Sequence, residues 1–227
     1  MSRPFAFPVK ALQICAMITD AEPSALDLVY AAKSPEALAD AYSRWAESYD
    51  RETLALGYCL PFVVTAWLAR FVAPGDGKVL DAGCGTGLSG PLLKALGYGP
   101  LWGLDMSPAM LAAANARDCY DRLVEAELGM PLPFSQAYFA AFISGGVFTA
   151  GHAPSSSLAG LAMCLNSGGY GIFTIRESIF ESGGFDAVLA DLVKRGVWTP
   201  VERSEPFRAF AIAEPEVLVQ THVFRRV

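Results

Sequence analysis

Short apolar segments that end in glycine or an acidic residue alternate along the chain with amphipathic segments. The apolar segments predict strands over residues 78–83, 101–105, 121–128, 140–146 and 168–177. The amphipathic segments predict helices over residues 89–96, 107–117, 155–165 and 185–196. Strands that alternate with helices predict an α/β fold, a Rossmann-like doubly wound sheet that is mainly parallel and has helices on both faces.

The two ends of the chain add elements of other kinds. Residues 24–53 predict helix, with Ser34 and Pro35 as a cap and first turn, and residues 61–72 predict another. Near the C-terminus, residues 205–212 and 216–224 alternate and predict an antiparallel hairpin. We therefore expect one domain over residues 1–227, in which 1–73 form a helical cap or lid and 74–227 form the core.

Composition narrows the class of protein. The share of hydrophobic residues is 53% and the mean hydropathy is +0.34, values that fit a sheet covered on both faces. The most apolar windows, 60–72 and 137–151, are shorter than the ~20 residues of a spanning helix. Residues 128–175 contain no Asp, Glu, Lys or Arg, which predicts either a buried sheet centre or an apolar cavity wall.

Charge and cysteine usage indicate the compartment and the partners. A net charge of −6 argues against a broad nucleic-acid surface, so we do not expect a nucleic-acid partner. The five cysteines are scattered without a CxxC pair, which fits a reducing cytoplasm and predicts no metal site. The first 20 residues lack a clear cleavage site and are interpreted as part of the mature chain.

The sequence VLDAGCGTGLSG, Val79 to Gly90, follows the first predicted strand and can be read in two ways. Gly85-x-Gly87-x-x-Gly90 matches a dinucleotide fingerprint. Asp81-x-Gly83-x-Gly85-x-Gly87 matches instead a loop that binds S-adenosylmethionine. Glycines between a strand and a helix allow a close approach of the backbone to either ligand.

Asp81 favours S-adenosylmethionine. In a dinucleotide fold the first glycine follows the strand almost directly, whereas here four residues from Asp81 to Cys84 precede Gly85. A carboxylate at the strand end suits a ligand with a positive amino group and would repel a pyrophosphate. Asp105 ends the second predicted strand and could bind ribose hydroxyls of either cofactor.

Asp81-Ala-Gly-Cys-Gly-Thr-Gly, together with Gly103-Leu-Asp105-Met-Ser-Pro-x-Met, resembles the class I S-adenosylmethionine-dependent methyltransferases. Other strings resemble, more narrowly, the Williams–Beuren syndrome region methyltransferase-like family: Trp45-Ala-Glu-Ser-Tyr49-Asp50, Leu56-Gly-Tyr58, Tyr120-Asp-Arg-Leu-Val-Glu-Ala-Glu127-Leu, Gly146-Val-Phe-Thr149 and Gly151-His152-Ala-Pro154. The chain departs from the family pattern at Tyr138-Phe139-Ala140 and at Asn166-Ser-Gly168-Gly169. Both departures concern turns at strand ends.

The resemblance implies roles at the matching positions. Gly83, Gly85 and Gly87 would pass beneath the cofactor, Asp105 would hold the ribose, and Met106 would flank the adenine. Glu127 and the Leu128 backbone would read the adenine edge, while Tyr49, Tyr42 and Arg51 would close over the methionine end. The predicted cofactor-binding set is Tyr42, Tyr49, Arg51, Asp81, Gly83, Gly85, Gly87, Asp105, Met106, Glu127, Leu128 and Ser144.

Several residues are candidates for contact with the methyl acceptor. Tyr42, Trp45 and Tyr49 share one helical face, either as a core stripe or as a lid that excludes water. His152 follows the fourth predicted strand, either as a turn-bonding residue or as an acceptor-orienting group or general base. The predicted substrate-binding set is Trp45, Tyr58, Phe148 and His152.

Two further positions near strand ends have alternative readings. Arg176 and Glu177 end the fifth predicted strand, either as a solvated strand end or as an acceptor contact. His222 lies in an alternating segment and is expected to be structural.

The sequence thus predicts a cytoplasmic S-adenosylmethionine-dependent methyltransferase that releases S-adenosylhomocysteine. Its expected partner is a small, partly hydrophobic acceptor that takes the methyl group by in-line displacement. The acceptor atom stays open among oxygen, nitrogen, sulfur and carbon. Two alternatives stay open as well: a catalytically silent protein that binds the same cofactor, and a nicotinamide-dependent oxidoreductase.

Overall fold

The computed structural model describes residues 25–32 and 34–227. The N-terminal segment interpreted above as mature chain, including Cys15, lies outside these residues. The sheet contains strands β1 (Val79–Ala82), β2 (Leu101–Asp105), β3 (Arg122–Glu125), β4 (Phe139–Phe148), β5 (Leu165–Arg176), β6 (Trp198–Arg203), β7 (Phe207–Arg208) and β8 (Leu218–Arg226). The helices are α1 (Ala25–Ala31), α2 (Pro35–Trp45), α3 (Tyr49–Ala55), α4 (Leu60–Phe71), α5 (Gly90–Ala95), α6 (Pro108–Asn115), α7 (Ser157–Cys164) and α8 (Phe185–Lys194), with a 3₁₀ turn η2 (Glu177–Ile179).

The strand order is β3-β2-β1-β4-β5-β8-β6, and β7 pairs with β8 beside this path. Strands β1 to β5 run parallel to one another, whereas β8 runs antiparallel between β5 and β6. The order reverses at β1, so that β1 and β4 flank the topological switch where ligands bind in such sheets. The predicted fold class, a mainly parallel doubly wound sheet with an antiparallel C-terminal strand, is confirmed.

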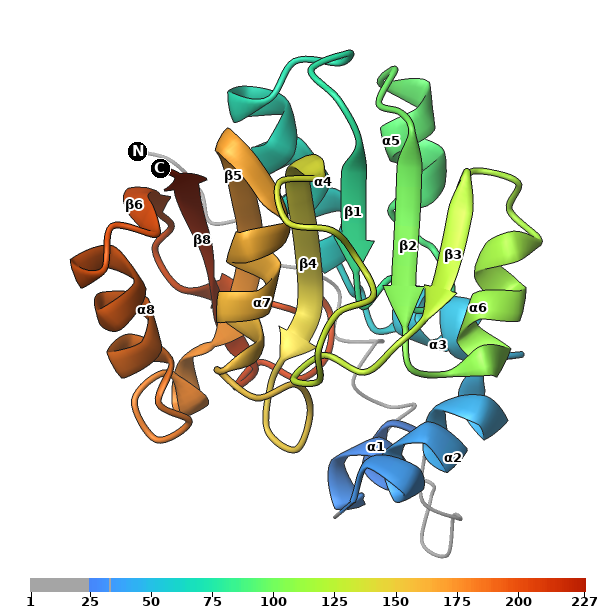
Figure 1. Ribbon diagram of the computed structural model, residues 1–227. Helices are drawn as coiled ribbons and strands as arrows, with labels where there is room; N and C mark the ends of the chain where they lie inside the picture. The colour runs from blue at the N-terminus through green and yellow to red at the C-terminus, as the bar shows by residue number, and fades with distance from the viewer. Residues whose placement is uncertain (1–24, 33) are drawn as a thin grey trace, which may run out of the picture.

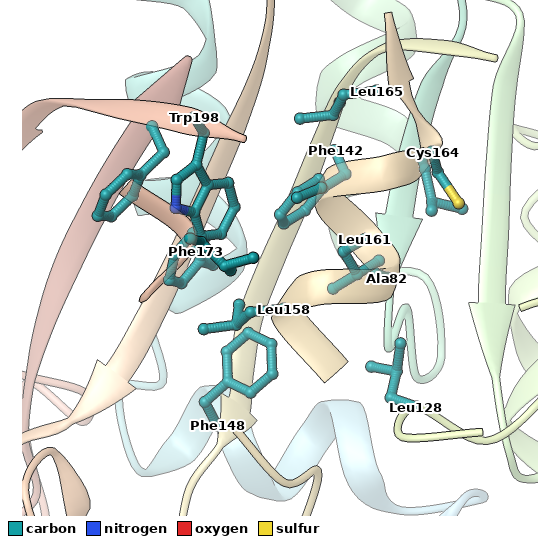
Figure 2. Packing of buried hydrophobic residues seen from close by; sticks show 14 of the residues in the cluster. Ala82, Leu128, Phe142, Phe148, Leu158, Leu161, Cys164, Leu165, Phe173 and Trp198 are labelled. Atoms are coloured by element: carbon teal, nitrogen blue, oxygen red, sulfur yellow. The ribbon is translucent and has the colours of Figure 1, made fainter. Parts of the chain in front are cut away.

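Apolar side chains cover both faces of the sheet. Adjacent residues of a strand point to opposite faces, so Phe142 and Phe173 join the cluster under α7 and α8, while Ile143 and Ile172 join the cluster under α4 with Leu68. Figure 2 shows the first of these clusters, in which α7 lies across the strands. The uncharged stretch therefore supplies much of the sheet centre.

The helical leader differs from its prediction. The helix expected over 24–53 is divided into α1, α2 and α3. One break falls where Ser34 caps α2, since its Oγ accepts the Ala37 N–H at 3.2 Å. Helix α4 packs on β4 and β5, whereas α1, α2 and α3 lie beyond the carboxyl ends of β1 to β4 (Figure 1). The helices closest to the ligand-binding edge are therefore the first three.

The C-terminal strands also differ in part. Strand β6 was not predicted, because only Trp198 of its six residues is buried and Pro200 interrupts any alternation. The predicted hairpin exists as the two-residue pairing of β7 with β8. Most of β8 pairs instead with β5 and β6, since its buried side chains complete the sheet core.

Candidate functional site

A first cavity, enclosing about 840 Å³ including its mouth, lies at the carboxyl ends of β1, β2 and β4. It is bounded by the glycine loop after β1, the ends of β2 and β4, and residues of α2 and α3. The predicted site residues that line it are Tyr42, Tyr49, Tyr58, Gly83, Gly85, Asp105, Met106, Glu127, Leu128 and His152. The structure thus brings together residues from seven separate segments of the sequence.

Each glycine of the loop is required for a different physical reason. A Cβ at Gly83 would lie 2.3 Å from Val147 Cγ2, and its φ is +76°. A Cβ at Gly85 would meet no described atom within 4 Å, because this position faces the first cavity. At Gly87 a Cβ would lie 2.9 Å from the Tyr120 ring, so this glycine serves packing and does not line the cavity.

Asp105 ends β2 and holds the loop in place. Its Oδ2 accepts the Gly85 N–H at 2.8 Å and its Oδ1 accepts the Ser107 N–H at 2.9 Å. Burial raises the pKa of the Asp105 carboxyl, and these backbone N–H bonds partly offset the rise. Together with Glu127, Asp105 gives the first cavity two carboxyl groups in its wall.

Asp81 is not where the sequence reasoning expected it. It is 2% exposed, it does not line the first cavity, and its Oδ2 accepts the Tyr120 hydroxyl at 2.8 Å. Burial raises its pKa to about 7. The carboxyl therefore supports the loop from beneath, in contrast to the expectation that it orients a ligand amino group.

Two other residues of the predicted cofactor set also lie away from the cavity. Ser144 is fully buried and donates to the Ala82 carbonyl at 2.8 Å, which ties β4 to β1. The Arg51 side chain is 80% exposed and lies 3.9 Å from the Glu52 carboxylate. Neither side chain faces the first cavity.

A second cavity, of about 560 Å³ including its mouth, adjoins the first. The two share Tyr42, Tyr49, Tyr58, Gly146 and His152 in their walls. Trp45 and Phe148, two of the predicted substrate residues, line the second cavity only. Most of the remaining wall is apolar and comes from α1, α4 and the C-terminal segment: Leu26, Val29, Leu60, Ala209, Phe210, Val217 and Val219.

His152 lies in the shared wall as a neutral imidazole with a fixed tautomer. Its Nδ1 is 3.0 Å from the Ala150 carbonyl oxygen, which only accepts, so Nδ1 carries the proton. Its Nε2 is 2.9 Å from the Tyr42 hydroxyl and accepts from it. Burial lowers the His152 pKa, and the nearby charge of Arg176 lowers it further. Sequence reasoning named both residues but missed that they form a pair.

Asp50 is a functional candidate that the sequence reasoning missed. Its carboxylate accepts the Thr86 hydroxyl at 2.6 Å and forms an ion pair with Arg117. Thr86 lies in the glycine loop and Asp50 in α3, directly after Tyr49. The contact therefore docks α3 on the loop. The string Tyr49-Asp50 could have suggested a role, but Arg117 lies 67 residues away.

His222 is a buried residue of the core. His222 is buried between Phe173 and Phe180, at ring-centroid distances of 5.8 and 5.5 Å, and burial lowers its pKa to about 4. It lines neither cavity and packs in the core, as expected for a structural residue. Within residues 25–32 and 34–227, no group of three or more His, Cys, Asp or Glu side chains could hold a metal ion.

The walls of the first cavity fit S-adenosylmethionine, which the resemblance implies. The open position at Gly85 allows a ligand to lie against the backbone. Carboxyl groups at Asp105 and Glu127 suit hydroxyl and amino donors, and Met106 and Leu128 offer apolar surfaces to a flat ring. A positively charged ligand also suits a wall that contains two carboxyl groups.

Comparisons with known proteins agree with this site. A methyltransferase domain family matches residues 80–173. Methyltransferase-like protein 27 of Homo sapiens is 32% identical over 173 residues, which cover 71% of this chain and 70% of that protein. A shorter segment of 66 residues is 42% identical to the 18S rRNA (guanine(1575)-N(7))-methyltransferase of Saccharomyces cerevisiae, covering 29% of this chain and 24% of that one.

Solved structures share the fold. A chain from the complex of the Haloferax volcanii Trm112 methyltransferase activator with a methyltransferase aligns with a TM-score of 0.62 at 18% identity, covering 82% of this chain and 97% of that chain. A TehB-like S-adenosylmethionine-dependent methyltransferase from Corynebacterium glutamicum aligns with a TM-score of 0.58 at 22% identity, covering 83% and 100%. By its relatives, its fold and its cavity, the chain belongs to the class I S-adenosylmethionine-dependent methyltransferases.

Proposed function

We propose that the protein methylates a small, partly hydrophobic acceptor that binds in the second cavity. The observation that supports this proposal is the wall shared by the two cavities, in which Tyr42, Tyr49, Tyr58 and His152 face both. An acceptor in the second cavity would meet the cofactor at this wall.

In this proposal Gly83, Gly85, Asp105 and Glu127 hold the cofactor. When bound, S-adenosylmethionine supplies a methyl carbon attached to a positively charged sulfur. The three tyrosines of the shared wall exclude water and present aromatic and hydroxyl groups to the reacting atoms. Alignment of the acceptor by the surrounding side chains is then the main contribution of the protein.

We further propose that Tyr42 and His152 remove a proton from an acceptor that arrives protonated. The His152 Nε2 lone pair already accepts from the Tyr42 hydroxyl. An acceptor that donates to the Tyr42 oxygen would therefore pass its proton to Tyr42 as Tyr42 passes its own to His152. Since burial keeps the His152 pKa below its ordinary value, the imidazole is neutral and ready to accept near pH 7.

The helical leader has a role in the same proposal. We propose that residues 1–73 act as the cap of a single domain, with α1, α2 and α3 as the part that closes over the shared wall. Tyr42 and Tyr49 belong to α2 and α3, while Leu26 and Val29 of α1 line the second cavity. These helices are tied to the glycine loop through Asp50.

A small acceptor is favoured over a nucleic acid. The second cavity is mostly apolar, and the net charge of −6 does not favour phosphate-rich partners. We propose a cytoplasmic location on the ground that the described cysteines, Cys59, Cys84, Cys119 and Cys164, are all free thiols. No helix in the described residues is long and apolar enough to cross a membrane.

Methyl transfer from labelled S-adenosylmethionine into a metabolite extract tests the function. We expect labelled product with the wild-type protein and at least a tenfold loss with Ala209→Leu, because the larger side chain fills the second cavity. Binding of S-adenosylhomocysteine by Ala209→Leu should stay within about twofold of wild type. Ala211→Leu, an exposed change in the same segment, is the matched control.

Three outcomes would contradict the proposal. Cofactor binding without any labelled product would support the alternative of a silent cofactor-binding protein. Equal product formation by wild type and Ala209→Leu would exclude the second cavity as the acceptor site. Stabilisation by NAD and none by S-adenosylhomocysteine in a melting experiment would contradict the cofactor itself.

A further inference from the structure

Strand β4 bulges where the two cavities meet. Its register with β5 shifts between Ser144 and Phe148. Residues 145–147 of β4 therefore stand opposite one residue of β5, Thr174. Gly146 lies within the bulge and lines both cavities, while Thr174 lines the second. The bulge thus brings a hydroxyl side chain of β5 into the wall of the second cavity.

Two hydroxyl groups bind the two ends of one peptide group in this bulge. The Thr174 Oγ1 accepts the Gly146 N–H at 3.0 Å. The Tyr58 hydroxyl donates to the carbonyl oxygen of Gly145 at 3.3 Å. A Cβ at Gly146 would lie 2.1 Å from the Tyr58 oxygen, so this glycine leaves the space that the hydroxyl group occupies. The spacing of the two hydroxyl groups is therefore set by the peptide group that joins Gly145 to Gly146.

Each of these hydroxyl groups keeps one unused hydrogen-bonding function, since a hydroxyl can both donate and accept. No described residue accepts the Thr174 O–H, and none donates to the Tyr58 oxygen. Thr174 is 1% exposed, and a buried donor without an acceptor is costly. Burial raises the pKa of Tyr58 well above its ordinary value, which keeps its hydroxyl neutral. The wall thus offers one neutral donor and one neutral acceptor.

The other threonines of the second cavity differ from Thr174. The Thr53 hydroxyl already donates to the Tyr49 carbonyl oxygen at 2.7 Å. Thr149 is half-buried, so solvent can match its hydroxyl group. The buried threonine with an unused donor in this wall is therefore Thr174.

We propose that the acceptor carries an amide group, whose carbonyl oxygen accepts from Thr174 and whose N–H donates to Tyr58. This inference rests on the proposed function, since it assigns the second cavity to the acceptor. The C=O and N–H of a trans amide point in opposite directions, as those of the peptide group between Gly145 and Gly146 do. An amide that lies antiparallel to this peptide group therefore matches both the spacing and the polarity of the two hydroxyl groups. The hydrogen bonds then form a closed ring in which each donor has an acceptor.

The amide positions the acceptor and is not the atom that is methylated. Its nitrogen lone pair is delocalised into the carbonyl group, so the nitrogen is a weak nucleophile. A carboxylate in the same place only accepts, and would leave the Tyr58 oxygen against another acceptor. Phe148, Phe210 and Val217 line the same cavity and would receive the apolar part of the molecule. Thr174 and Tyr58 are thus positioning residues that select a neutral amide.

Binding to the complex with S-adenosylhomocysteine tests the inference without turnover. The probes are N-methyl-2-phenylacetamide and its ester analogue, methyl phenylacetate, in which an oxygen replaces the N–H, each titrated by nuclear magnetic resonance. Tyr58→Phe should weaken binding of the amide about fivefold and should not weaken binding of the ester, because only the amide donates. Thr174→Val should weaken binding of both probes, because both carbonyl oxygens accept. Thr174→Ser keeps the hydroxyl and should bind both probes as the wild-type protein does.

Tyr98→Phe and Thr65→Val are the matched controls. Each removes a buried hydroxyl that donates to a backbone carbonyl oxygen, of Val72 at 2.7 Å and of Pro61 at 2.8 Å respectively, and neither residue lines a cavity. Both controls should bind the two probes as the wild-type protein does.

Three results overturn the inference: no binding of the amide by the wild-type protein at millimolar concentration, an equal loss of amide and ester in Tyr58→Phe, and unchanged binding of the amide in either Tyr58→Phe or Thr174→Val. Thr174→Val also leaves the Gly146 N–H without its acceptor. If this variant does not fold, Tyr58→Phe decides: a loss confined to the amide supports the inference, and an equal loss or no loss overturns it.

Labelled products provide an independent reading. After transfer from labelled S-adenosylmethionine into a metabolite extract, strong-acid hydrolysis should cleave the amide and change the chromatographic mobility of the labelled product. Mild alkali, which cleaves esters, should leave the mobility unchanged. A labelled product that survives strong acid unchanged overturns the inference and leaves the proposed function standing. Absence of all labelled product, together with the expected response of the two probes, counts against the proposed function and leaves the binding inference standing.

Discussion

The first cavity is bounded by backbone and by carboxyl groups at strand ends, whereas the second is bounded by apolar side chains from distant segments. Gly83, Gly85 and Asp105 of the first cavity lie within about one strand–helix–strand unit. The wall of the second runs from Leu26 in α1 to Val219 in β8. The first cavity is therefore built from residues close in sequence, and the second from residues brought together by the tertiary fold.

This difference in construction has a functional meaning. A site built from backbone and strand ends is fixed by the fold, since its geometry depends on hydrogen bonds such as that from the Gly85 N–H to Asp105. A site built from side chains of a helical cap and a C-terminal strand can change its lining without loss of the sheet. Relatives can therefore share the first cavity and differ in the lining of the second.

The largest expected effect follows from Gly83→Ala, which disturbs the backbone wall of the first cavity. The added Cβ would lie 2.3 Å from Val147 Cγ2, at a φ of +76°. Backbone strain and overpacking together should lower the free energy of unfolding by about 4 kcal/mol. The melting temperature of the cofactor-free protein should fall by roughly 12 °C.

Gly75→Ala is the control for this prediction. Gly75 also has a positive φ, +96°, but a Cβ there would meet no described atom within 4 Å. Its cost should be about 1 kcal/mol of backbone strain. Equal melting temperatures for the two variants would mean that Val147 moves aside easily. The wall of the first cavity would then be less rigid than the comparison of the two cavities assumes.

Asp81→Asn tests the carboxyl that supports the first cavity from beneath. The folded pKa is about 7, above the ordinary value of about 3.9. A raised carboxyl pKa means that stability is fully present below about pH 4 and is lost as the pH rises through about 7. The loss approaches 4 kcal/mol, at about 1.36 kcal/mol for each pKa unit. Asn carries no such charge, so Asp81→Asn should be more stable than wild type by about 3 kcal/mol at pH 8.5.

Urea unfolding at several pH values checks this prediction. The advantage of Asp81→Asn should shrink as the pH falls from about 8 towards 5. Asp191→Asn, which removes a carboxylate that is 57% exposed and paired with Arg195, should change stability by less than about 0.5 kcal/mol. An Asp81→Asn variant that is less stable than wild type at pH 8.5 would show that the ionised carboxylate stabilises the fold, contrary to this prediction.

The sequence predictions were correct mainly where a feature depends on residues close in sequence. Strand 101–105 matches β2, and Ser107 caps α6 as predicted, since its Oγ accepts the Met110 N–H at 3.4 Å. Such features depend on neighbours in sequence. The residues of the first cavity at strand ends were likewise predictable, because parallel strands bring their carboxyl ends to one edge.

Features that depend on distant partners were not predictable. Asp81 belongs to the same sequence motif as Gly83 and Gly85, which line the first cavity. The hydroxyl of Tyr120, 39 residues away, nevertheless holds the Asp81 carboxyl under the loop. Arg176 was left between a solvated strand end and an acceptor contact. The tertiary fold places this residue in the wall of the second cavity. The partners in each case come from pairing and packing that no local pattern records.

The smallest expected effect concerns the contact that joins the two sides. Asp50 in α3 accepts from Thr86 of the glycine loop at 2.6 Å and pairs with Arg117, and the adjacent Tyr49 lines both cavities. Asp50→Asn keeps the shape of the side chain and removes the charge. We expect the affinity for S-adenosylhomocysteine to fall about fivefold, because the partly exposed ion pair contributes about 1 kcal/mol to the docking of α3.

Asp40→Asn removes a more exposed ion pair, with Arg44 on α2, and should leave this affinity unchanged. Calorimetric titration of both variants makes the comparison, and equal affinities would mean that α3 holds its place through packing alone, so that the two cavities are coupled by their shared tyrosines and not by Asp50.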